Sequence, residues 1–104
     1  MYRQGDVLIV RDETPGEDRV PVPRDRRGRM VLAYGEATGH AHVVGGPGLT
    51  LTAEPDDPER MWIDVPRHGR ITHEEHGPIS LPAGRYRVIR QREYIPGAWR
   101  PVAD

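Results

Sequence analysis

The chain of 104 residues contains no cysteine, no lysine and no phenylalanine. Without cysteine it can form neither a disulfide nor a thiolate-ligated zinc site, and this absence agrees with a cytoplasmic protein. Without lysine it has no Schiff-base nucleophile and no phosphate-binding loop of the Walker type. Two large classes of enzyme mechanism are thereby excluded, and every cationic side chain apart from histidine is an arginine.

Long apolar runs and an excess of one charge are also absent. The longest apolar runs, Val7–Val10 and Met30–Tyr34, are far shorter than the roughly 20 residues of a membrane-spanning helix. No signal-peptide pattern follows Met1. The net charge of -1 gives no overall basic field. We therefore expect no membrane association and disfavour nucleic acid as a partner.

The residues that are present predict a single all-β domain over residues 1–104. The 12 glycines and 11 prolines lie between short apolar runs, and no apolar pattern with helical spacing persists for three turns. Seven or eight short strands then imply a small antiparallel barrel or sandwich. The expected strands are Asp6–Arg11, Arg29–Gly35, Thr38–Val44, Leu49–Ala53, Met61–Val65, Arg70–Glu74, Ile79–Leu81 and Arg85–Tyr94.

Three segments are expected to connect or follow these strands. Residues 12–28, rich in proline, glycine and charge, predict an exposed loop. Glu54–Glu59 predicts an acidic turn that joins two strands as a hairpin. Residues 95–104 predict an irregular tail, because proline and glycine interrupt it. A thin core with open sheet edges also predicts a homodimer.

Four of the five histidines fall into two doublets. His40 and His42 are separated by one residue, so on a strand their imidazoles would share a face. His73 and His76 are three residues apart, and a straight strand would direct them to opposite faces unless a turn or bulge near Gly77 re-aims one. If the two segments are neighbouring strands, three or four imidazoles meet in one place.

Such a cluster predicts a site for a divalent transition metal such as zinc, iron, manganese or nickel, because neutral imidazole combined with carboxylate suits these ions. The candidate ligands, in order, are His40 and His42, then His73 and His76, with Glu36 or Glu74 to complete or orient the set. Three protein ligands would leave a catalytic position open, whereas four would make a structural site. The sequence leaves this choice open, and with it the question of whether the protein is an enzyme.

Two other interpretations use the same histidines. A histidine with a glutamate partner can act as a general base near neutral pH without any metal. Alternatively, the histidines are ordinary polar residues on exposed strand faces and turns, hydrogen-bonded to neighbouring glutamates.

The most basic stretch is the expected last strand, where arginines alternate with tyrosine and valine. It carries Arg85, Arg87, Arg90 and Arg92. Guanidinium groups bind carboxylates and phosphates in a forked geometry. The alternative function is therefore a non-enzymatic module that docks a protein or another anionic partner through this strand.

Two family resemblances follow from these motifs. Gly35 with His40-Ala41-His42 resembles the first motif of the cupins, and Gly77 with Pro82-Ala83-Gly84 resembles their second, although Arg87 stands at its histidine position. This resemblance implies a β-barrel that holds a metal with histidine and glutamate. The strings QGDVL, GEATGHAH, HEEH, LPAGRY and QREY resemble a group of small bacterial and phage proteins without an assigned activity. That resemblance implies a bacterial or phage cytoplasmic protein.

Overall fold

The computed structural model describes residues 1–14, 18–35, 39–90, 92–95 and 98–101, with side chains through Arg90. All regular structure in these residues is β-strand. The strands are β1 (Tyr2–Gln4), β2 (Val7–Arg11), β3 (Val20–Pro21), β4 (Met30–Tyr34), β5 (Ala41–Gly45), β6 (Thr50–Glu54), β7 (Asp57–Thr72), β8 (Ile79–Arg90), β9 (Arg92–Ile95) and β10 (Ala98–Pro101). In this part of the chain no helix has the length and apolar character that a membrane crossing requires.

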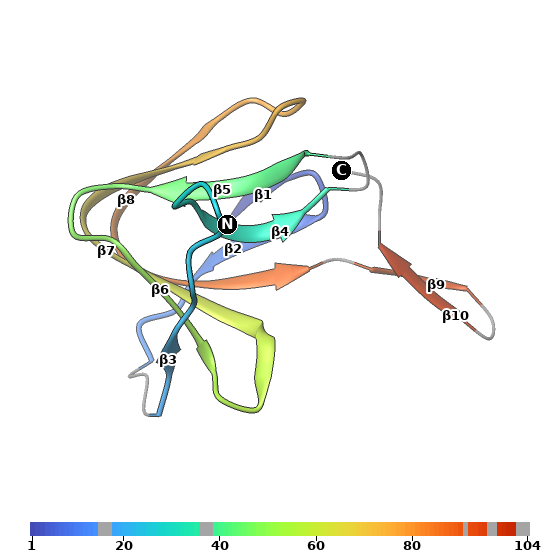
Figure 1. Ribbon diagram of the computed structural model, residues 1–104, viewed down its shortest axis with the longest axis horizontal. Coiled ribbons are helices and arrows are strands. Elements are labelled where there is room, and N and C mark those ends of the chain that lie inside the picture. Colours follow the sequence, from blue (N-terminus) through green and yellow to red (C-terminus); the bar gives the residue numbers. More distant parts are fainter. Residues whose placement is uncertain (15–17, 36–38, 91, 96–97, 102–104) are drawn as a thin grey trace.

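Eight of the strands form one antiparallel sheet that curls into a half-barrel (Figure 1). The hydrogen-bonded order is β1-β2-β8-β7-β5-β4, and β6 joins β7 while also pairing with β3. β9 and β10 make a separate hairpin that projects away from the curled sheet. The prediction of an all-β antiparallel domain is therefore confirmed.

The curl depends on the two longest strands, which pair with each other along most of their length. β7 pairs with β6 and β8 in its first half and with β5 and β8 in its second half. Between the halves the β7–β8 register shifts from Val65 to His68, a β-bulge that bends the strand. Each long strand was expected as two shorter ones, because Pro66 and Gly84 look like turn residues. They lie instead at irregularities within continuous strands.

The concave face of the half-barrel holds the core. Side chains of alternate residues on six strands meet there, and the largest of them is Tyr86, which is fully buried. Its hydroxyl donates to the carbonyl of Pro82 at 2.7 Å and accepts from Arg11 at 3.0 Å. With no phenylalanine in the chain, this tyrosine fills the centre of the core and satisfies its polar end at the rim.

The segment over residues 12–28 is exposed for most of its described length, as expected, but it also contains β3. Val20 pairs with Ala53 of β6, and Val22 packs against the core. The guanidinium of Arg19 lies 3.5 Å from the centre of the Trp62 ring. A cation–π contact of this kind fastens the segment to the convex face of the sheet.

Two further differences concern the ends of the chain, while the acidic turn agrees with the prediction. β1 was not expected, because Tyr2–Gln4 carries no apolar run. The tail was expected to be irregular, yet Ala98 pairs with Ile95 in the β9–β10 hairpin. Proline and glycine between them signal a turn as readily as a break, although residues 96 and 97 lie outside the described part. The predicted hairpin at Glu54–Glu59 is confirmed by the pairing of Glu54 with Asp57.

The turn after β5 packs closely on the bend of β7, which gives a stability prediction. A Cβ atom on Gly46 would overlap the backbone carbonyl oxygen of His68, whereas a Cβ on Gly45 meets nothing within 4 Å. Gly46→Ala should lower the free energy of unfolding by about 2 kcal/mol, a typical cost of overpacking. Gly45→Ala should change it by less than about 0.5 kcal/mol. Urea unfolding of both variants tests this, and equal effects would contradict the close packing.

Candidate functional site

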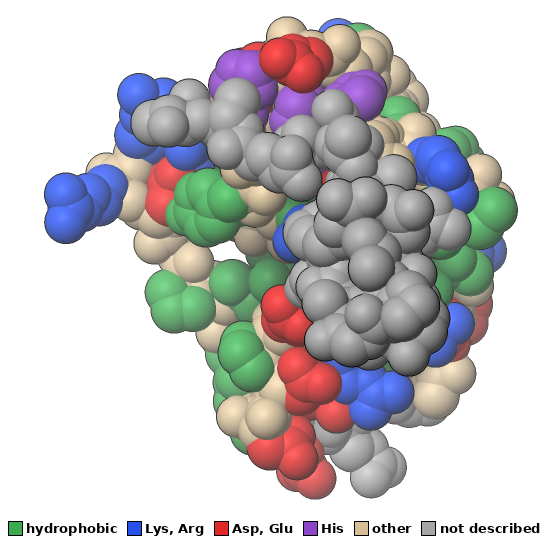
Figure 2. Space-filling model, turned by 90° about the vertical axis from the view of Figure 1, so that its right-hand side faces the viewer, with side chains coloured by type: hydrophobic (Ala, Val, Ile, Leu, Met, Phe, Trp, Pro, Cys, Tyr) green, Lys and Arg blue, Asp and Glu red, His purple; other side chains and the backbone are tan. Residues whose placement is uncertain are grey.

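The four histidines of the two doublets meet at one edge of the half-barrel. The ring centre of His73 lies 4.3 Å from that of His42, 4.8 Å from that of His76 and 5.7 Å from that of His40. Figure 2 shows histidine side chains gathered on one face beside acidic side chains. The four imidazoles therefore meet in one place, as the sequence allowed on the condition that the two segments are neighbours.

The convergence depends on where the strands end. His40 precedes β5 and His42 lies within it. β7 ends at Thr72, so His73 and His76 belong to the loop between β7 and β8 rather than to a strand. The alternation of a strand therefore does not apply to them, and both rings can turn toward β5.

Three donor groups form the tightest set. Ligand atoms of His40, His73 and Glu74 all lie within 4.8 Å of one another. The backbone N–H of Ala41 donates to Glu74 Oε1 at 2.8 Å, which ties the loop to the start of β5 and leaves Oε2 for a ligand. This bond, with smaller effects from His73 and His40, lowers the pKa of the Glu74 carboxyl, so the group is a carboxylate at neutral pH.

Glu75 lies beside the same two rings. Its backbone N–H donates to His73 Nδ1 at 3.1 Å, and its Oε1 lies 3.6 Å from His40 Nδ1. In neutral His73 the proton is then on Nε2, and ligation through Nδ1 would replace the bond from Glu75. Ligation through Nε2 would require the opposite tautomer.

His42 has a different role from the one expected. Its side chain is fully buried, and its Nδ1 lies 2.9 Å from Gln4 Oε1. Gln4 donates through Nε2 to the carbonyls of Ile71 and Gly77, so its oxygen faces His42 and Nδ1 carries a proton. His42 Nε2 lies 3.6 Å from Asp6 Oδ1. Both ring nitrogens of His42 therefore face side chains at the β1–β2 turn, Gln4 and Asp6. Its contact with the other histidines is the stacking of its ring on that of His73.

The network continues from Asp6 to Arg90. Both side chains lie at the β2–β8 edge, and Asp6 is 2% exposed. Arg90 donates to Asp6 Oδ2 through Nε at 2.8 Å and through Nη2 at 2.6 Å. A carboxylate this deeply buried needs such a partner, because removal from water is costly for an unpaired charge.

Sequence reasoning did not find the roles of Gln4 and Asp6. They flank the glycine of the β1–β2 turn, where polar residues are ordinary, and only the fold brings them beside His42. Of the remaining candidates, His76 contacts His73 but lies outside the set of three donors. Glu36 lies outside the described residues. His68, which was given no role, is exposed at the bend of β7.

The arginines of the last expected strand divide into two groups. Arg85 pairs with Asp64 at 2.5 Å and Arg90 with Asp6, so both serve the sheet itself. Arg87 is 45% exposed and 3.8 Å from Asp12. The side chain of Arg92 lies outside the described part.

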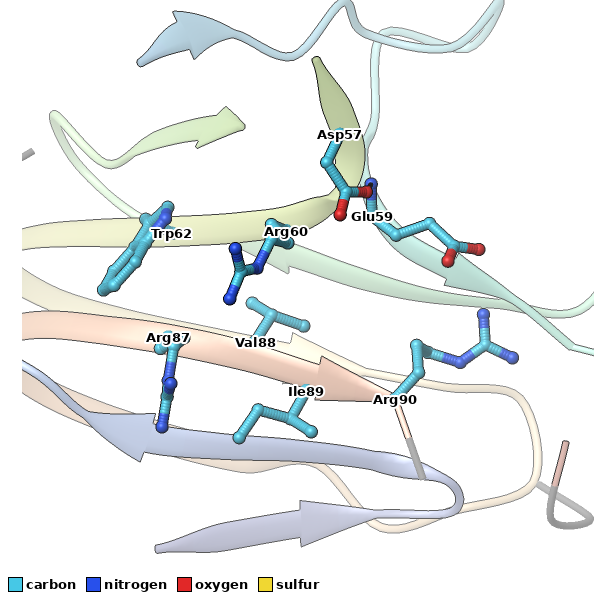
Figure 3. A pocket seen from close by; sticks show the side chains of 8 residues that line it. All are labelled: Asp57, Glu59, Arg60, Trp62, Arg87, Val88, Ile89 and Arg90. Carbon is cyan, nitrogen blue, oxygen red and sulfur yellow. Dashed lines mark hydrogen bonds between the residues drawn. The ribbon is translucent and has the colours of Figure 1, made fainter. Parts of the chain in front are cut away.

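A hollow of about 360 Å³ opens beside Arg87 (Figure 3). The ladder between β7 and β8 begins at Met61 and Val88, and the strands separate beyond that point. Arg60 and Trp62 line the hollow from β7, and Val88 and Ile89 form its apolar part. Asp57 and Glu59 add two carboxylates to the same hollow. Docking of an anionic partner by this strand stays a prediction.

A second hollow gives access to the histidine cluster. It measures about 300 Å³ and is lined by His73, Glu74, Thr72, Ala41, Val43 and Arg29. His40 and His73 are half-buried, while Glu74 is exposed. The donor set therefore combines side chains held by the fold with an open approach from solvent.

Comparison with known proteins places this chain in a family. A model described as Domain of unknown function (DUF8820) matches residues 3–91, which include both histidine doublets and the network beneath them. The chain belongs to this family. No curated protein and no solved structure matches it significantly. The family match agrees with the resemblance to small proteins without an assigned activity, while the cupin resemblance stays a prediction.

The Asp6–Arg90 pair gives a test of the network. Arg90→Met should lower the free energy of unfolding by about 3 kcal/mol at pH 7, because it leaves the buried Asp6 carboxylate without its guanidinium. Arg87→Met removes an identical group from a half-exposed position and should cost less than about 1 kcal/mol. Urea unfolding measures both. Similar losses for the two variants would show that the pair is not the buried anchor described above.

Proposed function

We propose that this protein binds a divalent transition metal through His40, His73 and Glu74. The observation that carries the proposal is the approach of their ligand atoms to within 4.8 Å, although His40 and His73 are 33 positions apart in the chain. Glu74 is already held beside Ala41 and is ionised at neutral pH. Two imidazoles and one carboxylate are a donor set that zinc, iron, manganese and nickel accept.

The distances fit a site that closes on its ion. Ligand atoms bound at about 2.1 Å in a tetrahedral site are roughly 3.4 Å apart. The three donors must therefore approach by up to about 1.4 Å, which rotation of partly exposed side chains can supply. His73 would exchange its bond from Glu75 for the metal. All three donors lie outside the strands, so the strands need not move and the change costs little.

The environment of the donors favours an open coordination position. Three protein ligands leave at least one position for water or another ligand, and the hollow lined by His73 and Glu74 leads to it. A metal ion held by the three donors could act there as a Lewis acid on a ligand in the open position, or lower the pKa of water bound in it. The ring of His42 stacks on that of His73, and the ring centre of His76 lies 4.8 Å from that of His73.

Metal analysis of protein purified without an affinity tag tests the proposal. Native protein equilibrated with Zn²⁺ or Ni²⁺ and then desalted should retain about one equivalent. Binding should weaken in acid, because protons compete with the metal ion for the imidazole nitrogens. His40→Ala and Glu74→Gln should each weaken binding at least tenfold, which isothermal titration measures.

Two controls separate ligation from folding. His68→Ala removes an exposed histidine from the bend of β7 and should retain the metal. His42→Ala should reduce stability without added metal, since it removes a fully buried side chain, whereas His40→Ala should not. Equal metal retention by native protein, His40→Ala and Glu74→Gln would contradict the proposal.

A further inference from the structure

The connection between β3 and β4 concentrates positive charge beside the histidine cluster. Within residues 24–29 there are four arginines and one aspartate, a net charge of +3 (4 − 1), although the whole chain carries -1. Figure 2 shows arginine side chains on the same face as the histidines. Overall neutrality therefore conceals a strongly basic loop.

The backbone of this loop is held in one shape by its only carboxylate. Asp25 accepts from the N–H groups of Arg27 and Arg29 at 3.0 and 2.8 Å, and from Arg29 Nε at 2.7 Å. Gly28, at φ +76°, closes the turn with its N–H on the Asp25 carbonyl. These bonds, led by the one from the Arg29 backbone, lower the pKa of the Asp25 carboxyl. The Asp25 carboxylate thus already accepts hydrogen bonds from within the turn.

Two arginines remain for an external anion. Arg26 and Arg27 are exposed, and no carboxylate within the described residues lies at ion-pair distance from either side chain. Arg24 donates to the Gly28 carbonyl at 2.8 Å, which keeps a third guanidinium at the same turn. A preformed turn loses little conformational freedom when these groups bind a phosphate.

An aromatic ring lies next to these guanidinium groups. Tyr34, at the end of β4, is 62% exposed although it is a large side chain. It lines a hollow of about 520 Å³ together with Gly39, Asp25 and the arginines of residues 24–29. A flat exposed ring beside phosphate-binding groups suits a ligand that has both a base and a phosphate. The volume is within the range of small-molecule sites.

We propose that the loop of residues 24–29 and Tyr34 bind a nucleoside phosphate, with the phosphate on Arg26 and Arg27 and the base on the Tyr34 ring. The ligand is either a free nucleotide or one unit of a single strand. This site does not depend on the metal. Arg29 lines both this hollow and the one beside His73 and Glu74, so a bound phosphate would lie next to the histidine cluster.

Isothermal titration of metal-free full-length protein tests the site with four probes: AMP, adenosine, inorganic phosphate and the oligonucleotide dT6. AMP should bind at least tenfold more tightly than adenosine or phosphate, because only AMP uses both the ring and the arginines. Affinity should fall with added salt. If dT6 exceeds AMP in affinity, a single strand is the natural source; if AMP exceeds dT6, a free nucleotide is.

Variants locate the binding. Arg26→Gln/Arg27→Gln should weaken AMP at least tenfold, and Tyr34→Ala about tenfold. Arg67→Gln/Arg70→Gln removes the same charge from exposed positions elsewhere and should leave AMP affinity unchanged. Equal AMP affinity in the loop variant and this control, AMP binding no tighter than phosphate, or no binding of AMP up to 5 mM (roughly −3 kcal/mol) would overturn the proposal. Because metal is absent throughout, none of these outcomes bears on the metal site.

Discussion

The buried contacts of Gln4 hold the histidine cluster together. Its amide binds the backbone at the end of β7 and in the loop that carries His73 and His76, and its oxygen meets His42 of β5. One side chain of β1 thus fixes two segments that are far apart in sequence. His42 in turn faces Asp6, whose charge is balanced by Arg90 of β8. A chain of polar groups this deep in a small core is stable only when every member has a partner.

The half-barrel and the polar chain depend on each other. Bending of β7 and β8 brings the strand that carries Gln4 across from the strand that carries His42, with β2, β8 and β7 between them in the sheet. The segment before β5 and the loop between β7 and β8 are therefore attached to a rigid sheet, which fixes the positions of the donor groups that they carry. Function placed on loops above a rigid sheet is common, because loops tolerate change while the sheet preserves geometry. The basic loop of residues 24–29 lies beside the same edge.

Sequence reasoning predicted the all-β class, because turn residues between short apolar runs are a short-range pattern. It gave the meeting of the two doublets only on the condition that their segments are neighbours, since contacts between distant segments depend on the fold. It did not predict the continuity of β7 and β8, since Pro66 and Gly84 signal a turn and a bulge equally well. Nor did it separate His40 from His42. Both belong to one His-x-His pattern. Only the structure shows that His42 is fully buried and contacts Gln4, whereas His40 is a candidate ligand.

The basic loop shows a similar limit. Composition indicated an exposed charged segment, but the use of Asp25 inside the turn, which leaves Arg26 and Arg27 without a described carboxylate partner, is a property of the folded chain.

X-ray absorption at the zinc edge of the zinc-loaded protein reports which atoms hold the ion. We expect a first shell of nitrogen and oxygen at about 2.0–2.1 Å, with outer-shell scattering from two imidazoles and a contribution from one carboxylate. A spectrum of oxygen ligands without imidazole scattering would contradict the assignment of His40 and His73 as the histidines that hold the metal.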